Sequence, residues 1–184
     1  MAAIRIQFLS AFQKSVRGSD PDAAIHYLAR LVAAGDLISI CRRLLVMAAE
    51  DIGLAYPNAI TIVKSCTDAA KELGFPEAQI PLAEAVILLA TAPKSNSAVN
   101  AIGAALSDFE HTDTGDIPKH LKDSHYKGAA KLGNGQTYKY PHSYSNHYVK
   151  QQYLPDNIKD RVYYEYGENK TEQAAKEYWE KIKK

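Results

Sequence analysis

A glycine-rich stretch late in the chain has part of the spacing of a phosphate-binding loop. Residues 128–133 read Gly-Ala-Ala-Lys-Leu-Gly, so two glycines are separated by four residues. A nucleotide-binding loop of this kind continues with Lys and then Ser or Thr, which contact the phosphates and Mg²⁺. Here Asn134 and Gly135 follow instead, and no apolar strand precedes the stretch. We therefore expect no cofactor site and no catalytic residues in this chain.

The histidines raise the question of a metal site. Two pairs, His120 with His125 and His142 with His147, are each five residues apart. A zinc site takes four ligands, and a helix presents ligands on one face at a spacing of four. The spacing is wrong for a helix and both cysteines lie elsewhere in the chain. The pattern favours polar loop histidines, and we expect no metal.

A short polar stretch interrupts the most apolar part of the sequence. Lys94, Ser95 and Asn96 follow a proline at the expected start of a helix. Their N–H groups and the lysine cation could face a bound anion. Capping of the helix explains the same residues, because every helix start has N–H groups without partners. We favour capping and keep the anion site as the alternative.

One segment, residues 119–153, has the composition of a nucleic-acid surface. Residues 119–150 hold six basic residues and one acidic residue, and nine of the twelve tyrosines lie between residues 126 and 166. Cations that follow phosphates and rings that stack on bases are how proteins bind single strands. The alternative, which we favour, is that the tyrosines pack this segment onto the rest of the protein. The DNA-binding hypothesis depends on Lys119, Lys122, Lys127, Lys131, Lys139, Tyr138 and Tyr140.

The element that positions these residues is a predicted helical hairpin over Ile80–Leu106. Its first arm, Pro81–Ala92, is aliphatic around nearly the whole circumference, which places it at the centre of a core with Leu88 in the middle. Pro93 ends this arm, and Ser95 can cap the second one. The second arm carries a single apolar stripe, formed by Val99, Ile102, Leu106 and Phe109.

Three more helices are expected before the hairpin, each with a capping residue at its start and a glycine at its end. Short links between helices make sequential neighbours antiparallel, which predicts an all-α fold with a compact helical bundle. The expected segments are Ser19–Gly35, Asp36–Gly53 and Asn58–Gly74, with only a short helix around Phe8–Phe12 before them.

The sequence after the hairpin differs in composition from the predicted bundle. Prolines and glycines interrupt residues 110–167, although the segment is too aromatic for a disordered one, so we expect an ordered irregular wrap. Residues 168–184 return to a helix, in which Glu172 and Lys176 have the spacing of an ion pair. The predicted domains are a lead-in at 1–17, a helical bundle at 18–109, the wrap at 110–167 and a C-terminal helix at 168–184.

Composition limits the class of protein. The 184 residues have 46% hydrophobic and 23% charged side chains and a net charge of +1, as in an ordinary globular protein. Cys41 and Cys66 fall on apolar helical stripes, which predicts buried reduced thiols. No signal peptide and no apolar run of about 20 residues is visible. We therefore expect a cytoplasmic protein without a membrane partner.

Five phrases in the sequence, taken together and in order, resemble a known family. They look like the C-terminal region of the replication-associated recombination ATPases, the RarA/MgsA family, and the likeness covers about residues 10–184. The phrases are Arg17-Gly-Ser-Asp-Pro-Asp-Ala-Ala24, Glu50-Asp-Ile-Gly-Leu-Ala55, Ala92-Pro-Lys-Ser-Asn96, Tyr138-Lys-Tyr-Pro-His142 and Gln151-Gln-Tyr-Leu-Pro155.

The resemblance implies more than the residues do. It implies an all-helical region, related to the clamp-loader collar, that follows an AAA+ ATPase module and assembles the protein as a homotetramer. ATP and Mg²⁺ would belong to that module, from which residues 1–17 would be a truncated linker. The family acts at stalled replication forks, with single-stranded DNA and single-strand-binding protein as partners, which implies association with the nucleoid.

Two functions from different classes therefore remain open. The first is a non-catalytic oligomerisation domain of a replication and recombination ATPase. The second is a single-stranded-DNA-binding module that acts through residues 119–153. An enzyme in its own right is disfavoured, because the sequence offers no nucleophile with a base, no metal set and no cofactor loop.

Overall fold

The computed structural model describes residues 2–124 and 134–184, and these residues form helices, turns and irregular segments without a β-strand. The predicted all-α fold is therefore confirmed. The chain divides into two compact units, of which unit 1 is Met1–Val99 with Tyr166–Gln173 and unit 2 is Asn100–Glu165 with Ala174–Lys184. Residues 125–133, with His125, Lys127, Lys131 and the two spaced glycines, lie outside the described residues.

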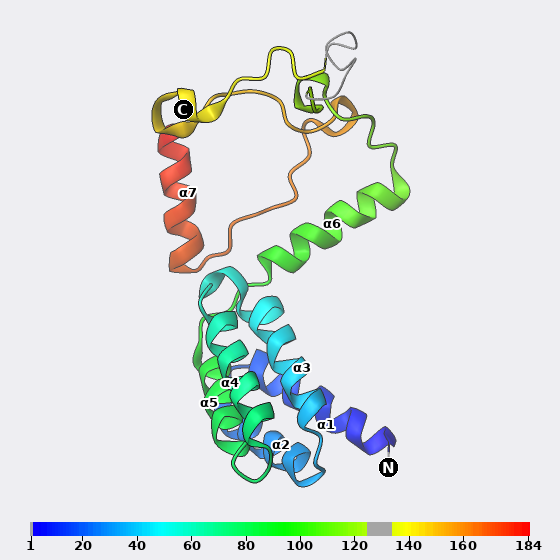
Figure 1. Ribbon diagram of the computed structural model, residues 1–184, viewed down its shortest axis with the longest axis vertical. Coiled ribbons are helices and arrows are strands. Elements are labelled where there is room, and N and C mark those ends of the chain that lie inside the picture. Colours follow the sequence, from blue (N-terminus) through cyan, green and yellow to red (C-terminus); the bar gives the residue numbers. More distant parts are fainter. Residues whose placement is uncertain (1, 125–133) are drawn as a thin grey trace. The chain divides into compact units, whose positions relative to one another are not determined.

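Unit 1 is a bundle of five helices (Figure 1). Two of its helix starts follow the sequence closely. Asp20 caps α2 by accepting a hydrogen bond from the Ala23 N–H at 2.9 Å, and Asp36 caps α3 by accepting one from the Ser39 N–H at 3.3 Å. The helices are α1 (Ala2–Arg17), α2 (Pro21–Ala33), α3 (Leu37–Met47), α4 (Ala59–Leu73) and α5 (Gln79–Thr91).

The first seventeen residues form much more than the short helix expected around Phe8–Phe12. Helix α1 covers sixteen residues, and its Phe12 and Val16 are fully buried in the core. The helix packs mainly against α2. Tertiary packing of Phe12 and Val16, which local sequence signals do not report, stabilises the C-terminal half of this helix.

The segment predicted as one helix from Asp36 to Gly53 is divided in the structure. Helix α3 ends at Met47 and continues as a π-helical turn, η1 (Ala48–Ile52), followed by a 3₁₀ turn, η2 (Gly53–Ala55). A π-helical turn has more residues per turn than an α-helix, so it changes which side chains face inward. As a result Asp51 and Ile52 are both buried.

Helix α5 lies at the centre of the bundle and contacts α1, α2, α3 and α4. Leu82, Val86 and Leu89 are fully buried, but the helix is not surrounded as the sequence suggested. Ile80 and Ile87 are exposed and Leu88 is only half-buried, because the neighbouring helices cover one side of α5.

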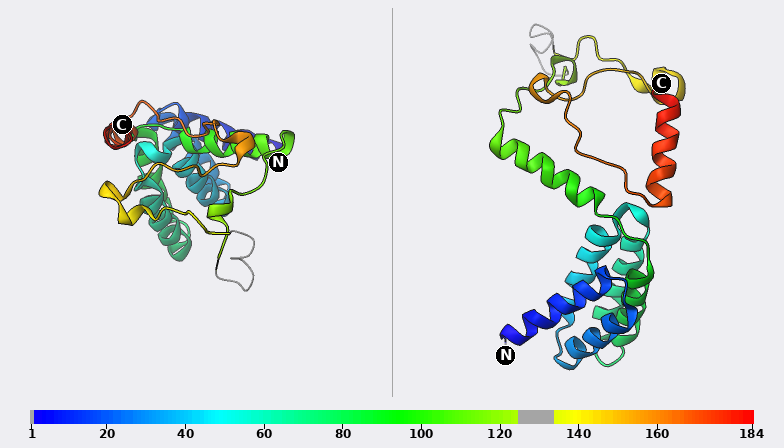
Figure 2. Two further views of the ribbon diagram at one scale, coloured as in Figure 1. Left: turned by 90° about the horizontal axis from the view of Figure 1, so that it is seen from above. Right: turned by 180° about the vertical axis from the view of Figure 1, so that it is seen from behind.

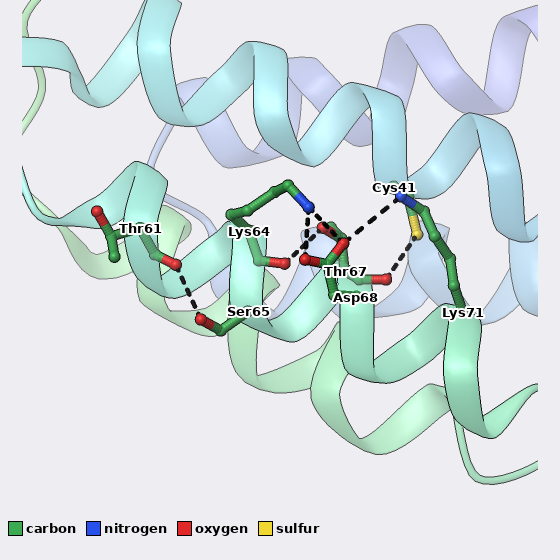
Figure 3. A network of polar contacts seen from close by, with 7 residues as sticks. All are labelled: Cys41, Thr61, Lys64, Ser65, Thr67, Asp68 and Lys71. Carbon is green, nitrogen blue, oxygen red and sulfur yellow. Dashed lines mark hydrogen bonds and ion pairs between the residues drawn. The ribbon is translucent and has the colours of Figure 1, made fainter.

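Both cysteines are buried and unpaired, as predicted, and burial raises the pKa of each thiol. Figure 3 shows how α3 meets α4 around Cys41, whose thiol donates to the Thr67 carbonyl oxygen at 3.9 Å. On the outer surface of α4 the carboxylate of Asp68 pairs with Lys64, and with Lys71 at 3.9 Å. These contacts are structural and offer no reactive thiol.

Unit 2 has little regular structure between its two helices, as Figure 2 shows. Helix α6 (Ser97–His111) leads into it and helix α7 (Lys170–Ile182) ends in it. Within the unit, Asp108 of α6 forms an ion pair with Arg161 Nε at 3.0 Å and accepts a hydrogen bond from the Tyr163 hydroxyl at 2.9 Å. The described part of the wrap contains short 3₁₀ turns, η3 (Lys119–Leu121), η5 (Pro141–Ser143), η6 (Ser145–His147) and η7 (Asp156–Ile158).

The apolar stripe of α6 has the predicted spacing but is not covered. The exposed fractions are 39% for Val99, 56% for Ile102, 54% for Leu106 and 74% for Phe109. None of the described helices combines the length and the apolar character that crossing a bilayer requires.

The burial of side chains in the bundle predicts which substitutions lower the free energy of unfolding most. Leu89→Ala should lower the free energy of unfolding by about 2–5 kcal/mol, because it removes a fully buried side chain and leaves a cavity. Ile60→Ala on the exposed side of α4 should cost much less. Denaturant unfolding measures both, and equal losses in the two variants would show that α5 is not the central helix.

Candidate functional site

The most unusual side chain of unit 1 is a buried carboxylate. Glu172 lies in the first turn of α7 and is only 2% exposed. The Ser95 hydroxyl donates to its Oε2 atom and the Ser97 hydroxyl to its Oε1 atom, each at 2.6 Å. The side-chain amide of Asn169 and the backbone N–H of Gly167 donate to it as well. A buried charge is tolerated only with hydrogen bonds of this kind.

Local sequence explains how the carboxylate reaches this position. Asn169 precedes α7 and accepts a hydrogen bond from the Glu172 N–H at 3.0 Å, while the Glu172 side chain returns to Asn169. Asn169 thus caps the start of α7 through its side-chain oxygen, and its side-chain amide donates to the Glu172 carboxylate. Ser97 is the first residue of α6. The carboxylate therefore lies at the N-terminal ends of two helices, whose partial positive charges favour an anion.

Close approach of the backbone is part of the site. A Cβ atom on Gly167 would lie 2.5 Å from Glu172 Oε2 and 3.2 Å from Ser95 Oγ, so any larger residue would displace one of them. Nearby, the Thr171 hydroxyl donates to the Ala55 carbonyl oxygen at 3.0 Å. The start of α7 is thus fastened to the bundle at two points.

The pKa of Glu172 reports the balance of these forces. Burial alone raises the pKa of this carboxyl group from its ordinary value of 4.5. Hydrogen bonds from Ser95, Ser97, Asn169 and the Gly167 N–H outweigh burial and lower the pKa to about 2. Glu172 is therefore ionised at every physiological pH, which suits a fixed anchor and not an acid or base catalyst.

A second set of interactions connects Glu172 and Ser95 to the C-terminal end of α1. The Ser95 N–H donates to the Asp51 carbonyl oxygen at 2.8 Å, and the buried Asp51 carboxylate accepts a hydrogen bond from Arg17. Gly53 (φ +47°) is required here, because a Cβ atom would lie 2.9 Å from the Ser95 carbonyl oxygen. We call Arg17, Asp51, Ser95, Ser97 and Glu172 the clamp.

The structure shows the contacts of Lys94, Ser95 and Asn96, the residues considered as a possible anion site. Lys94 Nζ donates to the Ala92 and Ala90 carbonyl oxygens at 2.6 and 3.2 Å, at the C-terminal end of α5, and burial lowers the pKa of this lysine. Ser95 faces the carboxylate of Glu172, and Asn96 is exposed. An external anion at Ser95 would have to displace Glu172. Helix α6 begins at Ser97 rather than at Ser95.

The two tyrosines proposed to bind DNA lie in a strip of unit 2 with exposed aromatic rings. Tyr138 and Tyr140 are exposed, and the ring centroids of Tyr140 and His142 lie 5.2 Å apart. His142 is followed by His147 at 4.9 Å, which makes a row of three rings. Gln151 holds this strip in place by bonding both the N–H and the carbonyl oxygen of Lys139, at 3.2 and 2.8 Å.

The lysines of the same segment differ in their surroundings. Lys139 and Lys119 are exposed, whereas Lys122 forms an ion pair with Asp116. Lys127 and Lys131 lie outside the described residues. Within residues 2–124 and 134–184, no three His, Cys, Asp or Glu side chains are grouped closely enough to hold a metal ion.

Sequence reasoning missed Glu172. The spacing to Lys176 suggested an ordinary ion pair on a helix surface, whereas the structure buries the carboxylate beside residues more than seventy positions earlier. The available signal was Asn169-Lys-Thr-Glu172, which has the spacing of a capping box. That signal predicts the helix start but not the two serines.

The five sequence phrases that carry the family resemblance supply residues to the clamp in unit 1 and to the strip around Lys139 in unit 2. Three of them supply Arg17, Asp51 and Ser95 to the clamp, and the other two meet where Gln151 bonds Lys139. A family model described as "MgsA AAA+ ATPase C terminal" matches residues 18–183. The chain belongs to this family. The resemblance read from the sequence is therefore confirmed.

Relatives of this MgsA-type chain are longer proteins. It is 59% identical over 177 residues to the replication-associated recombination protein A of Bacillus subtilis, which covers 96% of this chain and 42% of that protein. It is 39% identical over 158 residues to the protein of the same name in Escherichia coli K12, covering 85% and 35%. It is 33% identical over 162 residues to "ATPase WRNIP1" of Dictyostelium discoideum, covering 87% and 18%.

The lowered pKa predicts a pH-dependent contribution of Glu172 to stability. Because the folded-state pKa of about 2 lies below the ordinary 4.5, this stabilisation is complete above about pH 5 and is lost as the pH falls toward 2. It amounts to no more than about 3 kcal/mol. Glu172→Gln, compared with the wild type by denaturant unfolding from pH 7 to pH 2, should show a stability deficit that shrinks with falling pH.

The matched control is Glu180→Gln, which removes the same charge from an exposed position of α7. It should change stability little at any pH. A deficit in Glu172→Gln that is the same at pH 7 and pH 2 would mean that the carboxylate charge contributes nothing to the clamp.

Proposed function

We propose that this chain is an oligomerisation domain that assembles the copies of a replication and recombination AAA+ ATPase. The observation that carries the proposal is the exposed apolar stripe of α6, formed by Val99, Ile102, Leu106 and Phe109. Soluble proteins rarely leave a contiguous apolar face of this kind uncovered, and such faces mark interaction sites. A second copy is the partner that is always present at matching concentration.

A homotetramer is the assembly that we propose. A closed tetramer with dihedral symmetry uses at least two different self-complementary contacts. Besides α6, the uncovered side of α5 offers Ile80 and Ile87, 67% and 47% exposed. Beside Ile80 lies a groove of about 540 Å³ between α2 and α5, lined mainly by apolar side chains such as Ile25 and Val32. Two separate apolar surfaces support an assembly larger than a dimer.

The chain spans less than half the length of the relatives described above. We propose that ATP binding and hydrolysis belong to another part of such a longer protein and that this domain is non-catalytic. The names of the two bacterial relatives concern replication-associated recombination, which supports the proposal of a cytoplasmic location on the nucleoid. Single-strand-binding protein is a further proposed partner of the longer protein.

Self-assembly predicts a specific molar mass. Light scattering coupled to size exclusion should give four times the mass of one chain, and Leu106→Asp should reduce it, because a charge would enter the apolar contact. The control is Ala104→Asp, which adds the same charge on the opposite side of α6 and should leave the mass unchanged. A monomeric wild type at high micromolar concentration would refute the proposed function.

A second candidate function is single-stranded-DNA binding by unit 2. The row of Tyr140, His142 and His147 favours it, because exposed rings side by side can stack on bases. Lys139 lies in the same strip, between two exposed tyrosines. In this hypothesis the rings bind bases and Lys119 and Lys139 bind phosphates.

The DNA hypothesis predicts how affinity depends on salt. Each phosphate contact on a single strand contributes about −0.7 to the slope of log affinity against log salt. Lys119→Gln with Lys139→Gln should therefore flatten the slope by about 1.4, whereas Tyr140→Ala should weaken binding by about 1–3 kcal/mol at an unchanged slope. Fluorescence anisotropy with a short oligonucleotide measures both effects.

The matched control for charge is Lys64→Gln with Lys71→Gln, on the surface of α4. These substitutions remove the same charge and should leave the slope as in the wild type. Equal slopes for both double variants, or no binding of the wild type, would eliminate the second function.

A further inference from the structure

Helix α6 carries a glycine that no neighbour among residues 2–124 and 134–184 requires. Gly103 lies in the middle of the helix, and a Cβ atom built on it would meet no heavy atom within 4 Å. Glycine weakens a helix relative to alanine, because it has more backbone freedom to lose. The open space at Gly103 leaves room for an atom from outside the chain to approach the helix closely.

The residues around Gly103 form a socket. Val99, Ile102, Gly103 and Leu106 have the i, i+3, i+4, i+7 spacing of the four residues that receive a side chain from a neighbouring helix. The lack of a side chain on Gly103 makes this socket deep. Its walls are apolar and exposed, so it takes an apolar side chain.

The same helix carries a side chain that fits the socket. Phe109 is the most exposed large apolar residue of the stripe, at 74%, and lies one turn after Leu106. Gly103 and Phe109 are each three residues from Leu106. If two copies of α6 cross antiparallel at Leu106, each Phe109 lies opposite the partner's Gly103. A helix with both a socket and its complement in this symmetric order suits a two-fold contact between copies.

Charge favours the antiparallel order over the parallel one. The last turn of α6 carries Glu110, and its nearest acidic neighbour, Asp108, is bonded by Arg161. A parallel pair would place the two Glu110 side chains beside each other. In the antiparallel pair each Glu110 lies opposite Ile102 of the other copy, nearer the positive end of that helix dipole.

We propose that α6 pairs with α6 of a second copy, antiparallel about Leu106, with Phe109 of each copy seated over Gly103 of the other. This proposal rests on the proposed self-assembly and names the contact that produces it. One helix face supplies only part of the roughly 800 Å² per partner of a standard interface. The α6 pair is accordingly one of the two contacts of the tetramer.

The direct test is a cysteine placed on the symmetry axis. Two cysteines form a disulfide only when their Cα atoms lie within about 7 Å, so Leu106→Cys should link two chains upon mild oxidation. Ala104→Cys, exposed on the opposite side of α6, should remain unlinked. The wild type should also remain unlinked, because Cys41 and Cys66 are buried.

A second pair of variants tests the socket. Gly103→Leu fills it and should weaken association at least tenfold in a dilution series followed by light scattering. Ala104→Leu places the same side chain on the opposite side of α6 and should leave association unchanged. Gly103→Leu combined with Phe109→Ala, in which the new side chain replaces the lost ring, should recover most of the association.

The outcomes of these experiments distinguish the proposed α6 pair from the more general proposal that the chain is an oligomerisation domain. A tetrameric wild type whose Leu106→Cys variant does not link, or whose Gly103→Leu variant associates normally, overturns the α6 pair and leaves the oligomerisation domain intact. Such a result would direct attention to a contact of the stripe with the α2–α5 groove of another copy. A monomeric wild type overturns the oligomerisation domain itself.

Discussion

The structure depends on one buried carboxylate. Removing Glu172 from water is unfavourable, and the cost is offset by donors from three places: the α5–α6 link, the start of α6 and the start of α7. These are the segments at which the chain passes from unit 1 into unit 2 and at which it returns. Through the Ser95 backbone and Asp51, the same network reaches Arg17 at the end of α1. Both passages are thereby fastened to one bundle.

This constraint gives the apolar stripe its significance. A helix with an exposed apolar face is useful for assembly only if its orientation does not drift, since lost freedom at an interface weakens association. Ser97 begins α6 and is bonded to Glu172, while Asp108 near the other end of the helix is bonded to Arg161 and Tyr163. Most of the stripe lies between Ser97 and Asp108 on this helix. In the proposed assembly, the clamp would hold the start of α6 without contributing a residue to the contact between copies.

Much of the fold could be read from local signals. The caps at Asp20 and Asp36, the central position of α5 and the irregular texture after α6 follow from propensity and apolar spacing. What could not be read depends on distant contacts. Helix α1 packs into the core through Phe12 and Val16, and the π-helical turn that buries Asp51 leaves no clear trace in the sequence. Glu172 had a local explanation as a helix-surface charge, and only its two distant serines show that this explanation is incomplete. The exposed side of α5 was missed for a related reason, because apolar content alone does not tell a buried face of a helix from an exposed one.

Hydrogen exchange provides the most direct measurement of the central claim, that one carboxylate fastens both chain passages. In Glu172→Ala, the amides of residues 95–100 and of residues 167–173 should lose protection together and by similar factors, while the amides of α2 and of the buried side of α5 exchange as in the wild type. That result would show a single cooperative unit held by Glu172. Loss of protection confined to residues 167–173, with residues 95–100 unchanged, would contradict the account.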